Sequence, residues 1–476
     1  MKFKRYETGA QIDETALQPK RLQISGINRR KMLSGLAGSS IGLLSVNPAS
    51  AQDGSEWYNA IFNHASTSGH SDGKLGPQKP AQLEDLRTGP VPLRSDEMLA
   101  RIDRAIIDYR KIIVVGGWQI EGKIKLLRPG DDDPAIPSIR KRLIMSGDIP
   151  PEGAGYNEGS FAFDQWLELG VKKFQKRHGL RISGRLDRPT RAQIAVTAEA
   201  RLQQLILNRQ RIVELLEKGQ LNRYILVNAA SFQLEAVEQF EVQQRHRVIV
   251  GKPDRQTPAI DATIKGLNFF PFWHVPDSVA NLDLIPRLMR EPDYLDKEHI
   301  RAAEGYYGPE INTTNIDWRT VDTDVIKFRQ DPGPWNALGL VRINMPNKEI
   351  VYLHDTPMKE LFRRHHRAYS AGCVRVENVF DLVSWIAKYE PVLGESGAVR
   401  HIIDQADISQ MREKRPAEYD VTLTRPLPVT FTYITAWVED DGTVAFRPDV
   451  YSRDGAIELI GDDDPDAPKP PIMLSP

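Results

Sequence analysis

A histidine at the end of an apolar run, followed by a cysteine beside a glycine, is the feature that most constrains this chain. The run Ile350–Leu353 leads into His354, and the single cysteine of the chain, Cys373, follows nineteen positions later. Such a run predicts a strand that carries the imidazole at its end, while Gly372 permits a tight turn before Cys373. A lone thiol cannot form an intramolecular disulfide, so a thiolate and imidazolium pair for acyl transfer is the functional interpretation.

These segments resemble the catalytic signature of the L,D-transpeptidase (YkuD-type) family, which remodels peptidoglycan. Three other segments are similar to landmarks of this family, and especially of its larger, YcbB-like branch: Thr257–Pro258, Asn268–Pro276 and Asp331–Gly339. One position departs from the pattern, because Ala371 stands where many members have a histidine two places before the cysteine. The larger branch commonly lacks that histidine too, so the departure favours a subgroup of the family.

A second resemblance covers a shorter segment. Residues Leu169–Leu180, with Ser183–Asp187 and Thr190, are similar to a small three-helix peptidoglycan-binding domain. Phe174 and Leu180 are expected to be core residues, so binding would fall to exposed polar groups. Together the two resemblances imply an α+β multidomain protein. Its catalytic domain would be β-rich and carry an insertion.

Helical periodicity dominates the first half of the chain. Four apolar residues predict an amphipathic helix from Ser95 to the break at Gly116 and Gly117: Met98, Ile102, Ile106 and Ile107. Two short helices follow, at Ile139–Ile144 and Leu167–Leu180. Thr190 is the predicted cap of a third helix, which is expected to continue as a connecting strut until Gly219.

The period changes at Arg223, where short strands separated by turns begin. The predicted strands are Tyr224–Asn228, Phe232–Val237, His246–Gly251, Leu340–Asn344 and Glu349–Leu353. A helix is expected at Val379–Ile386, and the turn Asp440–Gly442 predicts a late hairpin. The predicted organisation is a signal peptide at 1–51, a flexible linker at 52–94, a helical lead-in with the peptidoglycan-binding-like domain at 95–200, a connecting helix at 201–222, the catalytic domain at 223–395 with an insertion at 277–330, and a C-terminal extension and tail at 396–476.

The N-terminus has the order of an export signal. Asn28–Leu33 contains an arginine pair, a mildly apolar stretch follows to Val46, and Ala49–Ala51 offers a small-residue cleavage site. The arginine pair suggests the twin-arginine route to the periplasm. The apolar stretch is shorter than the roughly 20 residues of a membrane span, so cleavage after Ala51 is expected to leave no stable membrane span.

Charge narrows the classes of partner. The full chain has 63 Lys and Arg against 64 Asp and Glu, and loss of residues 1–51 removes eight basic and three acidic residues. The remaining 55 basic and 61 acidic residues give a formal charge of −6, and this acidic balance does not indicate nucleic-acid binding. No spaced Cys/His set and no glycine-rich phosphate loop occur, so neither a metal nor a cofactor is expected.

Within the site, the resemblance assigns Cys373 as nucleophile and His354 as general base. A backbone carbonyl near the turn is the expected partner of the other imidazole nitrogen, because the Asp355 side chain should point away. The backbone N–H groups of Gly372 and Cys373 are candidate oxyanion donors. Arg375 is a candidate for holding a substrate carboxylate, with a loop-fixing salt bridge as the alternative.

Five further residues complete the candidate site or compete with it. Tyr352, Ser370 and Trp335 are candidate substrate-binding residues. His365 and His366 compete for the role of base, but their charged surroundings indicate a solvated surface and lowered basicity.

The resemblance implies a periplasmic L,D-transpeptidase that acts on peptidoglycan stem peptides and glycan and that carbapenems acylate. It would cleave the diamino acid–D-Ala bond of a tetrapeptide stem and form 3→3 cross-links. The alternatives are L,D-carboxypeptidase activity, attachment of a stem to a protein amine, or a catalytically inactive peptidoglycan-binding protein. The insertion would cap the groove or be a structural elaboration.

Overall fold

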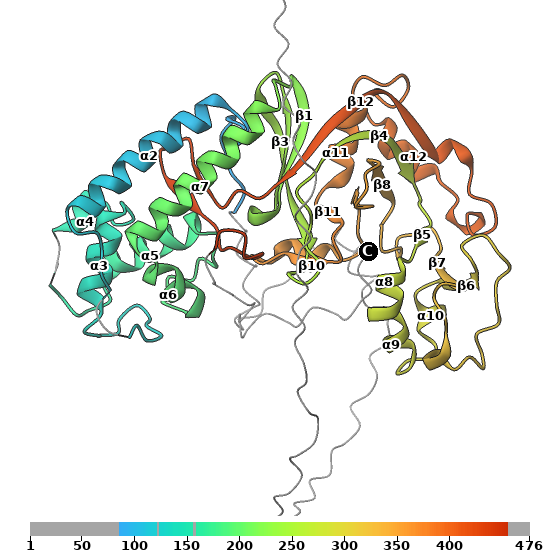
Figure 1. Cartoon of the computed structure of the whole chain (residues 1–476), viewed down its shortest axis with the longest axis horizontal. Coiled ribbons are helices and arrows are strands. Elements are labelled where there is room, and N and C mark those ends of the chain that lie inside the picture. The colour runs from blue at the N-terminus through green and yellow to red at the C-terminus, as the bar shows by residue number, and fades with distance from the viewer. Residues whose placement is uncertain (1–84, 121–122, 156–158, 456–476) are drawn as a thin grey trace, which may run out of the picture. The chain divides into compact units, whose positions relative to one another are not determined.

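The computed structural model describes residues 85–120, 123–155 and 159–455. The predicted signal peptide, the linker as far as residue 84 and the predicted tail lie outside the described residues. The described protein is α+β, as expected, with a helical region before a mixed sheet (Figure 1). None of its helices is both long and apolar enough to cross a bilayer. The helical region contains α2 (Asp96–Val114), α3 (Ile136–Met145), α4 (Pro151–Ala154), α5 (Gln165–Arg177), α6 (Arg188–Ala195) and α7 (Ala198–Glu217).

Helix α2 begins and ends where the sequence predicts. The Ser95 hydroxyl accepts a hydrogen bond from the Met98 N–H at 3.1 Å, which satisfies one of the free donors of the first turn. Gly116 and Gly117 follow the helix with φ of 99° and 62°, a conformation that favours glycine. The predicted first helix and its break are therefore confirmed.

The third predicted helix is wrong in its cap and in its length. Asp187 caps α6 by accepting a hydrogen bond from the Thr190 N–H at 3.0 Å, whereas Thr190 itself is buried in the first turn. Helix α6 ends at Ala195, and Thr197 caps the separate helix α7. Asp and Thr are comparable caps, so propensity alone does not rank two candidates three residues apart.

A nine-stranded mixed sheet forms the second part of the protein, in the order β10-β3-β11-β9-β8-β4-β12-β1-β2. Its inner strand β12 runs parallel to β1 and antiparallel to β4, and it comes from beyond residue 395. This sheet is therefore completed by the C-terminal segment. The strands are β1 (Arg223–Asn228), β2 (Gln233–Glu238), β3 (Glu241–Gly251), β4 (Asp261–Phe269), β8 (Val341–Asn344), β9 (Leu353–His354), β10 (Ala368–Ser370), β11 (Val374–Val376) and β12 (Asp420–Thr432).

Beyond this sheet the chain adds a hairpin and several short helices. Strands β13 (Ala436–Val438) and β14 (Val444–Phe446) pair antiparallel across the predicted turn, where Gly442 has φ of 82°. The other elements are α11 (Val379–Ala387), α12 (Ala398–Gln405) and the 3₁₀ turns η1 (Ala229–Ser231), η4 (Lys359–Arg363), η5 (Ile408–Gln410) and η6 (Ala417–Tyr419).

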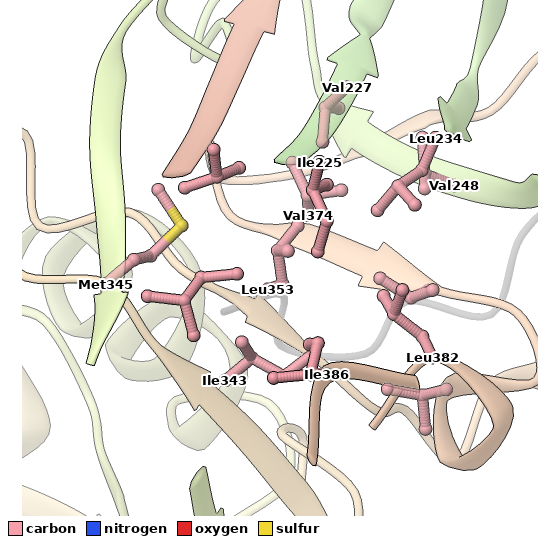
Figure 2. Packing of buried hydrophobic residues seen from close by; sticks show 14 of the residues in the cluster. Ile225, Val227, Leu234, Val248, Ile343, Met345, Leu353, Val374, Leu382 and Ile386 are labelled. Atoms are coloured by element: carbon pink, nitrogen blue, oxygen red, sulfur yellow. The ribbon is translucent and has the colours of Figure 1, made fainter. Parts of the chain in front are cut away.

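Apolar packing fixes the two short strands β9 and β11. Leu353 and Val374 are fully buried among residues of neighbouring strands, and α11 adds Leu382 and Ile386 to the same cluster (Figure 2). Burial of such a side chain contributes about 1.5–3 kcal/mol. Strands of two and three residues therefore keep their positions through packing more than through their own length.

Residues 273–330 form a separate small layer, which begins before the predicted insertion at 277–330. Strands β5 (Trp273–His274), β7 (Ile326–Gln330) and β6 (Ile300–Glu304) make a three-stranded sheet with its own apolar core. Tyr352 and Ala371 pack against that core, so the insertion reaches the segment that carries Cys373. Its helical elements are α8 (Asp277–Val279), the π-helical turn η2 (Ala280–Leu284), α9 (Ile285–Leu288), α10 (Tyr294–Lys297) and the 3₁₀ turn η3 (Trp318–Thr320).

The last ten residues of the predicted linker, 85–94, are held against the sheet. Arg87 forms a buried ion pair with Glu235 of β2 at 2.7 Å. The Pro90 carbonyl accepts a hydrogen bond from the N–H of Val242 in β3 at 2.9 Å. Their assignment to a flexible linker is therefore wrong. Composition does not show that a polar segment has charged partners far along the chain.

We expect the inner position of β12 to make the fold depend on the C-terminal segment. Leu427→Ala removes a side chain that is 2% exposed, so it should lower the free energy of unfolding by about 2–5 kcal/mol. Thr422→Ala, at an exposed position of the same strand, should change it by less than about 0.5 kcal/mol. Chemical denaturation measures both, and equal effects would contradict the inner placement of β12.

Candidate active site

Parallel pairing of β9 and β11 brings the predicted catalytic residues together. His354 and Arg375 are direct partners in the register, and the Tyr352 carbonyl accepts a hydrogen bond from the Val374 N–H at 3.0 Å. Side chains alternate along extended segments, so Tyr352 and His354 share a face with Cys373 and Arg375. The predicted strand Glu349–Leu353 is wrong in its first part, because Ile350 has φ of 54° and is exposed.

A glycine turn presents Cys373. Gly372 has φ of 125°, which other residues adopt only with strain. The Ser370 hydroxyl donates to the Cys373 carbonyl at 2.5 Å and accepts from the Gly372 N–H at 3.1 Å. The Thr257 hydroxyl donates to the Gly372 carbonyl at 2.8 Å. Both peptide groups that precede the thiol are thereby fixed.

This turn corrects two predicted roles. The Gly372 N–H is occupied by Ser370, so it is not free to stabilise an oxyanion. The Cys373 N–H has no acceptor among the described residues, so of the two predicted donors it alone is free. Ser370 is fully buried, and its hydroxyl holds the turn, which leaves it no position for binding substrate.

His354 is fully buried and held in one orientation. Its Nδ1 lies 2.5 Å from the Asp355 carbonyl oxygen, which can only accept, so Nδ1 carries the proton. Its Nε2 has no hydrogen-bond partner among the described residues. The Asp355 carboxylate turns away, accepts from the Leu340 N–H at 3.0 Å and pairs with Lys359. The carbonyl is therefore the orienting group, as predicted, and Nε2 keeps a free lone pair.

Burial makes both members of the pair neutral in the resting site. It raises the pKa of the Cys373 thiol to about 11, against the opposing effects of hydrogen bonds from Tyr352 and the charge of Arg375. Burial, reinforced by the charge of Arg375, holds the pKa of His354 well below its usual value. The described structure has no hydrogen bond between the two side chains, and the thiol lies 4.0 Å from the Ile350 carbonyl. A thiolate and imidazolium pair would therefore form only as the thiol attacks a substrate, and the predicted pair stays a prediction.

Arg375 is almost completely buried, with 1% of its surface exposed. Its Nη1 lies 3.4 Å from the Met358 sulfur, while Nε and Nη2 have no acceptor among the described residues. The alternative of a loop-fixing salt bridge is therefore wrong. Arg375 lines a cavity of about 10 Å³ together with Trp335 and with Tyr294 of the insertion. Such a volume holds about one water molecule.

The two predicted aromatic residues have different surroundings. Trp335 lines the cavity and stacks on His299 with ring centroids 4.0 Å apart, and its indole N–H has no acceptor among the described residues. Tyr352 lies edge-on to His354 with centroids 5.7 Å apart. Tyr352 therefore contacts the catalytic pair, whereas Trp335 contacts the cavity beside it.

The competing histidines do not reach the thiol. Burial lowers the pKa of His365 to about 4, and the next residue but one, Arg367, is fully buried. The predicted solvated surface is thus wrong for His365 and Arg367, whereas Arg363 is exposed. The pKa of His365 is lowered, as predicted, but mainly by burial and only secondarily by nearby cations such as Arg367. His274 contacts Tyr306 of the insertion, and burial lowers its pKa as well.

Sequence reasoning assigned no role to two residues that hold the turn. Thr257 is fully buried under Gly372, and its landmark position beside Pro258 was the only signal. Tyr451, from the C-terminal segment, donates its hydroxyl to the Gly251 carbonyl at 2.7 Å and accepts from the Thr257 N–H at 3.3 Å. Nothing in the local sequence of Tyr451 indicates this contact.

Comparison with known proteins assigns families to two segments. Residues 222–393 match the sequence profile of the L,D-transpeptidase catalytic domain, and residues 152–194 match that of a putative peptidoglycan binding domain. A Haemophilus influenzae protein described as a putative L,D-transpeptidase is 31% identical over 262 residues. That alignment covers 54% of this chain and 49% of the relative, so it spans about half of each protein.

Two solved structures show weaker likeness. An L,D-transpeptidase from Xylanimonas cellulosilytica is 11% identical, with 65% of this chain and 98% of that chain covered and a TM-score of 0.19. A fused Zn-dependent amidase/peptidase/peptidoglycan-binding protein from Clostridium acetobutylicum is 12% identical, with 31% and 72% covered and a TM-score of 0.13. Scores this low carry no argument about the site.

We expect the neutral resting pair to determine how the thiol reacts with pH. Because the pKa of Cys373 is raised to about 11, the thiol is protonated at neutral pH, and its alkylation by iodoacetamide should accelerate continuously from pH 7 to pH 10. Intact-mass spectrometry measures this rate on the single cysteine. A rate that is already constant between pH 6 and pH 8 would instead reveal a preformed thiolate.

Proposed function

Since residues 222–393 form an L,D-transpeptidase catalytic domain and residues 152–194 a peptidoglycan-binding-type domain, we propose that this chain is a periplasmic L,D-transpeptidase. Its substrate would be a tetrapeptide stem, cleaved between the diamino acid at position three and D-Ala at position four. Its product would be a 3→3 cross-link. The observation that supports this most is the pairing of β9 and β11, which places Cys373 and His354 on one face.

The first half of the proposed reaction forms a thioester. Cys373 Sγ attacks the carbonyl carbon of the diamino acid, and its proton moves to the free Nε2 of His354. The Cys373 N–H stabilises the oxyanion. Collapse of the tetrahedral intermediate breaks the C–N bond, and His354 returns the proton to the departing D-Ala amine.

The second half resolves the thioester. The side-chain amine of a second stem attacks the same carbonyl carbon and gives a proton to Nε2, and the thiol leaves with that proton. Water competes with the amine for the thioester, so access to the carbonyl decides the product. The insertion would help to exclude water, because its core packs against Tyr352 and Ala371, which lie two residues before His354 and Cys373.

Arg375 has two proposed roles. Its charge lies close enough to oppose the raised pKa of Cys373, so it would stabilise the thiolate that forms during attack. Its free Nε and Nη2 would bind a substrate carboxylate with paired hydrogen bonds. A cavity of about 10 Å³ is too small for a carboxylate, so the second role requires movement of the insertion residues that close it.

The two domains place the proposed activity outside the cytoplasm, where peptidoglycan lies. The twin-arginine-type signal falls outside the described residues, and export by that route is part of the proposal. A folded protein with one thiol would pass through it without a disulfide partner.

We predict that purified mature protein converts tetrapeptide muropeptides into 3→3 cross-linked dimers with release of D-Ala. Cys373→Ala should abolish both products because no other thiol exists in the chain. Mass spectrometry of the muropeptides reports the bond cleaved and the acceptor together. Tripeptide monomers without dimers would show a carboxypeptidase, and persistent cross-linking by Cys373→Ala would exclude the proposal.

We also predict that carbapenems acylate the wild-type chain, because Sγ can open the β-lactam ring in place of the stem amide. His354→Gln should slow acylation about 10²–10⁴-fold, the usual contribution of a general base. His365→Gln removes another partly buried imidazole and should leave the rate within about twofold. Intact-mass spectrometry follows the adduct, and equal rates in the two variants would reject His354 as the base.

A further inference from the structure

A charge network joins the segment before α2 to both sides of the nucleophile turn. Asp85 Oδ2 lies 2.6 Å from Arg367 Nη2, and Asp85 Oδ1 lies 2.8 Å from Arg247 Nε. Arg247 Nη1 in turn lies 3.0 Å from Glu377 Oε2. Asp85 thus connects two cations, of which one also holds a second carboxylate.

The positions of these residues along the chain show which segment the network holds. Arg367 directly precedes β10, and Glu377 directly follows β11, so the segment between them carries Cys373. The Arg367 carbonyl accepts from the Val250 N–H, and the Glu377 N–H donates to the Arg247 carbonyl, both at 2.9 Å. The two ends of the nucleophile segment are therefore fixed on β3 and joined through Asp85.

Burial makes the position of Arg367 depend on Asp85. The Arg367 side chain is 1% exposed and that of Asp85 10% exposed. Burial raises the pKa of Asp85, but the charges of Arg367 and Arg247 outweigh it and leave the pKa lowered. Removal of one member of such a pair leaves a desolvated charge, which is strongly unfavourable. Arg367 also donates to the Arg364 carbonyl at 2.6 Å and to the Phe232 carbonyl at 3.3 Å, but neither acceptor carries a charge. Loss of the Asp85 charge should therefore shift the guanidinium and, with it, the start of β10.

Displacement of β10 reaches the thiol in few steps. Ser370 ends β10, and its hydroxyl holds both the Gly372 N–H and the Cys373 carbonyl. Asp85 itself is fixed, because its carbonyl accepts from the Gln233 side chain at 2.7 Å. The family match covers residues 222–393, so it includes Arg367 and Glu377 but not Asp85.

We propose that Asp85 is a positioning residue for Cys373, and that the catalytic unit of this chain therefore begins before its helical region. Asp85 acts through Arg367 and Arg247 and touches neither the thiol nor the site of the substrate. The effect on turnover rests on the proposed function, whereas the effect on the geometry of the thiol does not.

The experiment uses the full mature chain and four substitutions. Asp85→Asn removes the charge with little change in shape, and Asp85→Glu restores it. Glu377→Gln breaks the network at a carboxylate that is 25% exposed, where less stability is lost. Glu390→Gln is the matched control: it removes a buried carboxylate that accepts from the Thr424 and Arg425 N–H groups, far along the sheet from β10.

Three measurements separate positioning from stability: kcat and KM for cross-linking, the rate of Cys373 alkylation by iodoacetamide, and the thermal midpoint. Because a shift of about 1 Å can cost 10²-fold in rate, Asp85→Asn should lower kcat about 10–100-fold with KM nearly unchanged. Asp85→Glu should recover most of that loss. Glu390→Gln should lower the thermal midpoint but keep kcat within about twofold.

Two results would overturn the proposal. One is a kcat of Asp85→Asn within about twofold of wild type. The other is an equal loss of kcat in Glu390→Gln when the two variants have the same thermal midpoint. If Asp85→Asn does not fold, Glu377→Gln decides, since positioning requires it to lower kcat with KM unchanged. If the wild type forms no cross-links, the proposed function fails on its own. The rate of Cys373 alkylation then tests the positioning role of Asp85. Equal alkylation rates in Asp85→Asn and Glu390→Gln would contradict that role.

Discussion

The site depends on one short parallel pairing, that of β9 with β11. These strands have two and three residues, yet their register sets His354 beside Arg375 and places Cys373 next to Tyr352. Hydrogen bonds alone would not hold such short strands. The surrounding apolar cluster, which includes Leu353, Val374 and residues of α11, fixes the pairing because a slip of one residue would turn apolar side chains towards the site.

Burial of Cys373 and His354 makes the thiolate costly to form and protects the thiol at rest. With the pKa of Cys373 at about 11, forming the thiolate at neutral pH costs on the order of 5 kcal/mol. The resting thiol is thus protected by its proton, and its activation depends on the presence of a bound substrate. In the proposed reaction, proton transfer to His354 would create opposite charges within a buried site, where their attraction is strong. A fixed tautomer and the nearby charge of Arg375 then favour the thiolate only when the attack proceeds.

The sequence was most informative where local chemistry decides the structure. The helix start at Ser95, the break at Gly116, the turn at Gly442 and the orienting role of a backbone carbonyl all follow from residue types within a few positions. It was least informative where distant segments meet. Ser370 and Gly372 were given roles towards the substrate, but the turn uses both groups internally. The contacts of Tyr451 and Asp85 join residues more than a hundred positions apart, and composition assigned the latter to a linker.

These distant contacts change what the catalytic unit is. The family match begins at residue 222, yet the sheet takes β12 from beyond residue 395 and is held by residues 85–94 from before α2. The helical region therefore lies between two segments of the catalytic unit in the sequence, and both of its ends connect to the sheet. A further contact joins α5 of the helical region to the β13–β14 hairpin. The Arg177 guanidinium donates to the Val444 carbonyl at 3.1 Å and also pairs with the buried Asp148. Under the proposed function, attachment at several points would constrain the orientation of the active site relative to bound peptidoglycan far more than a single linker would.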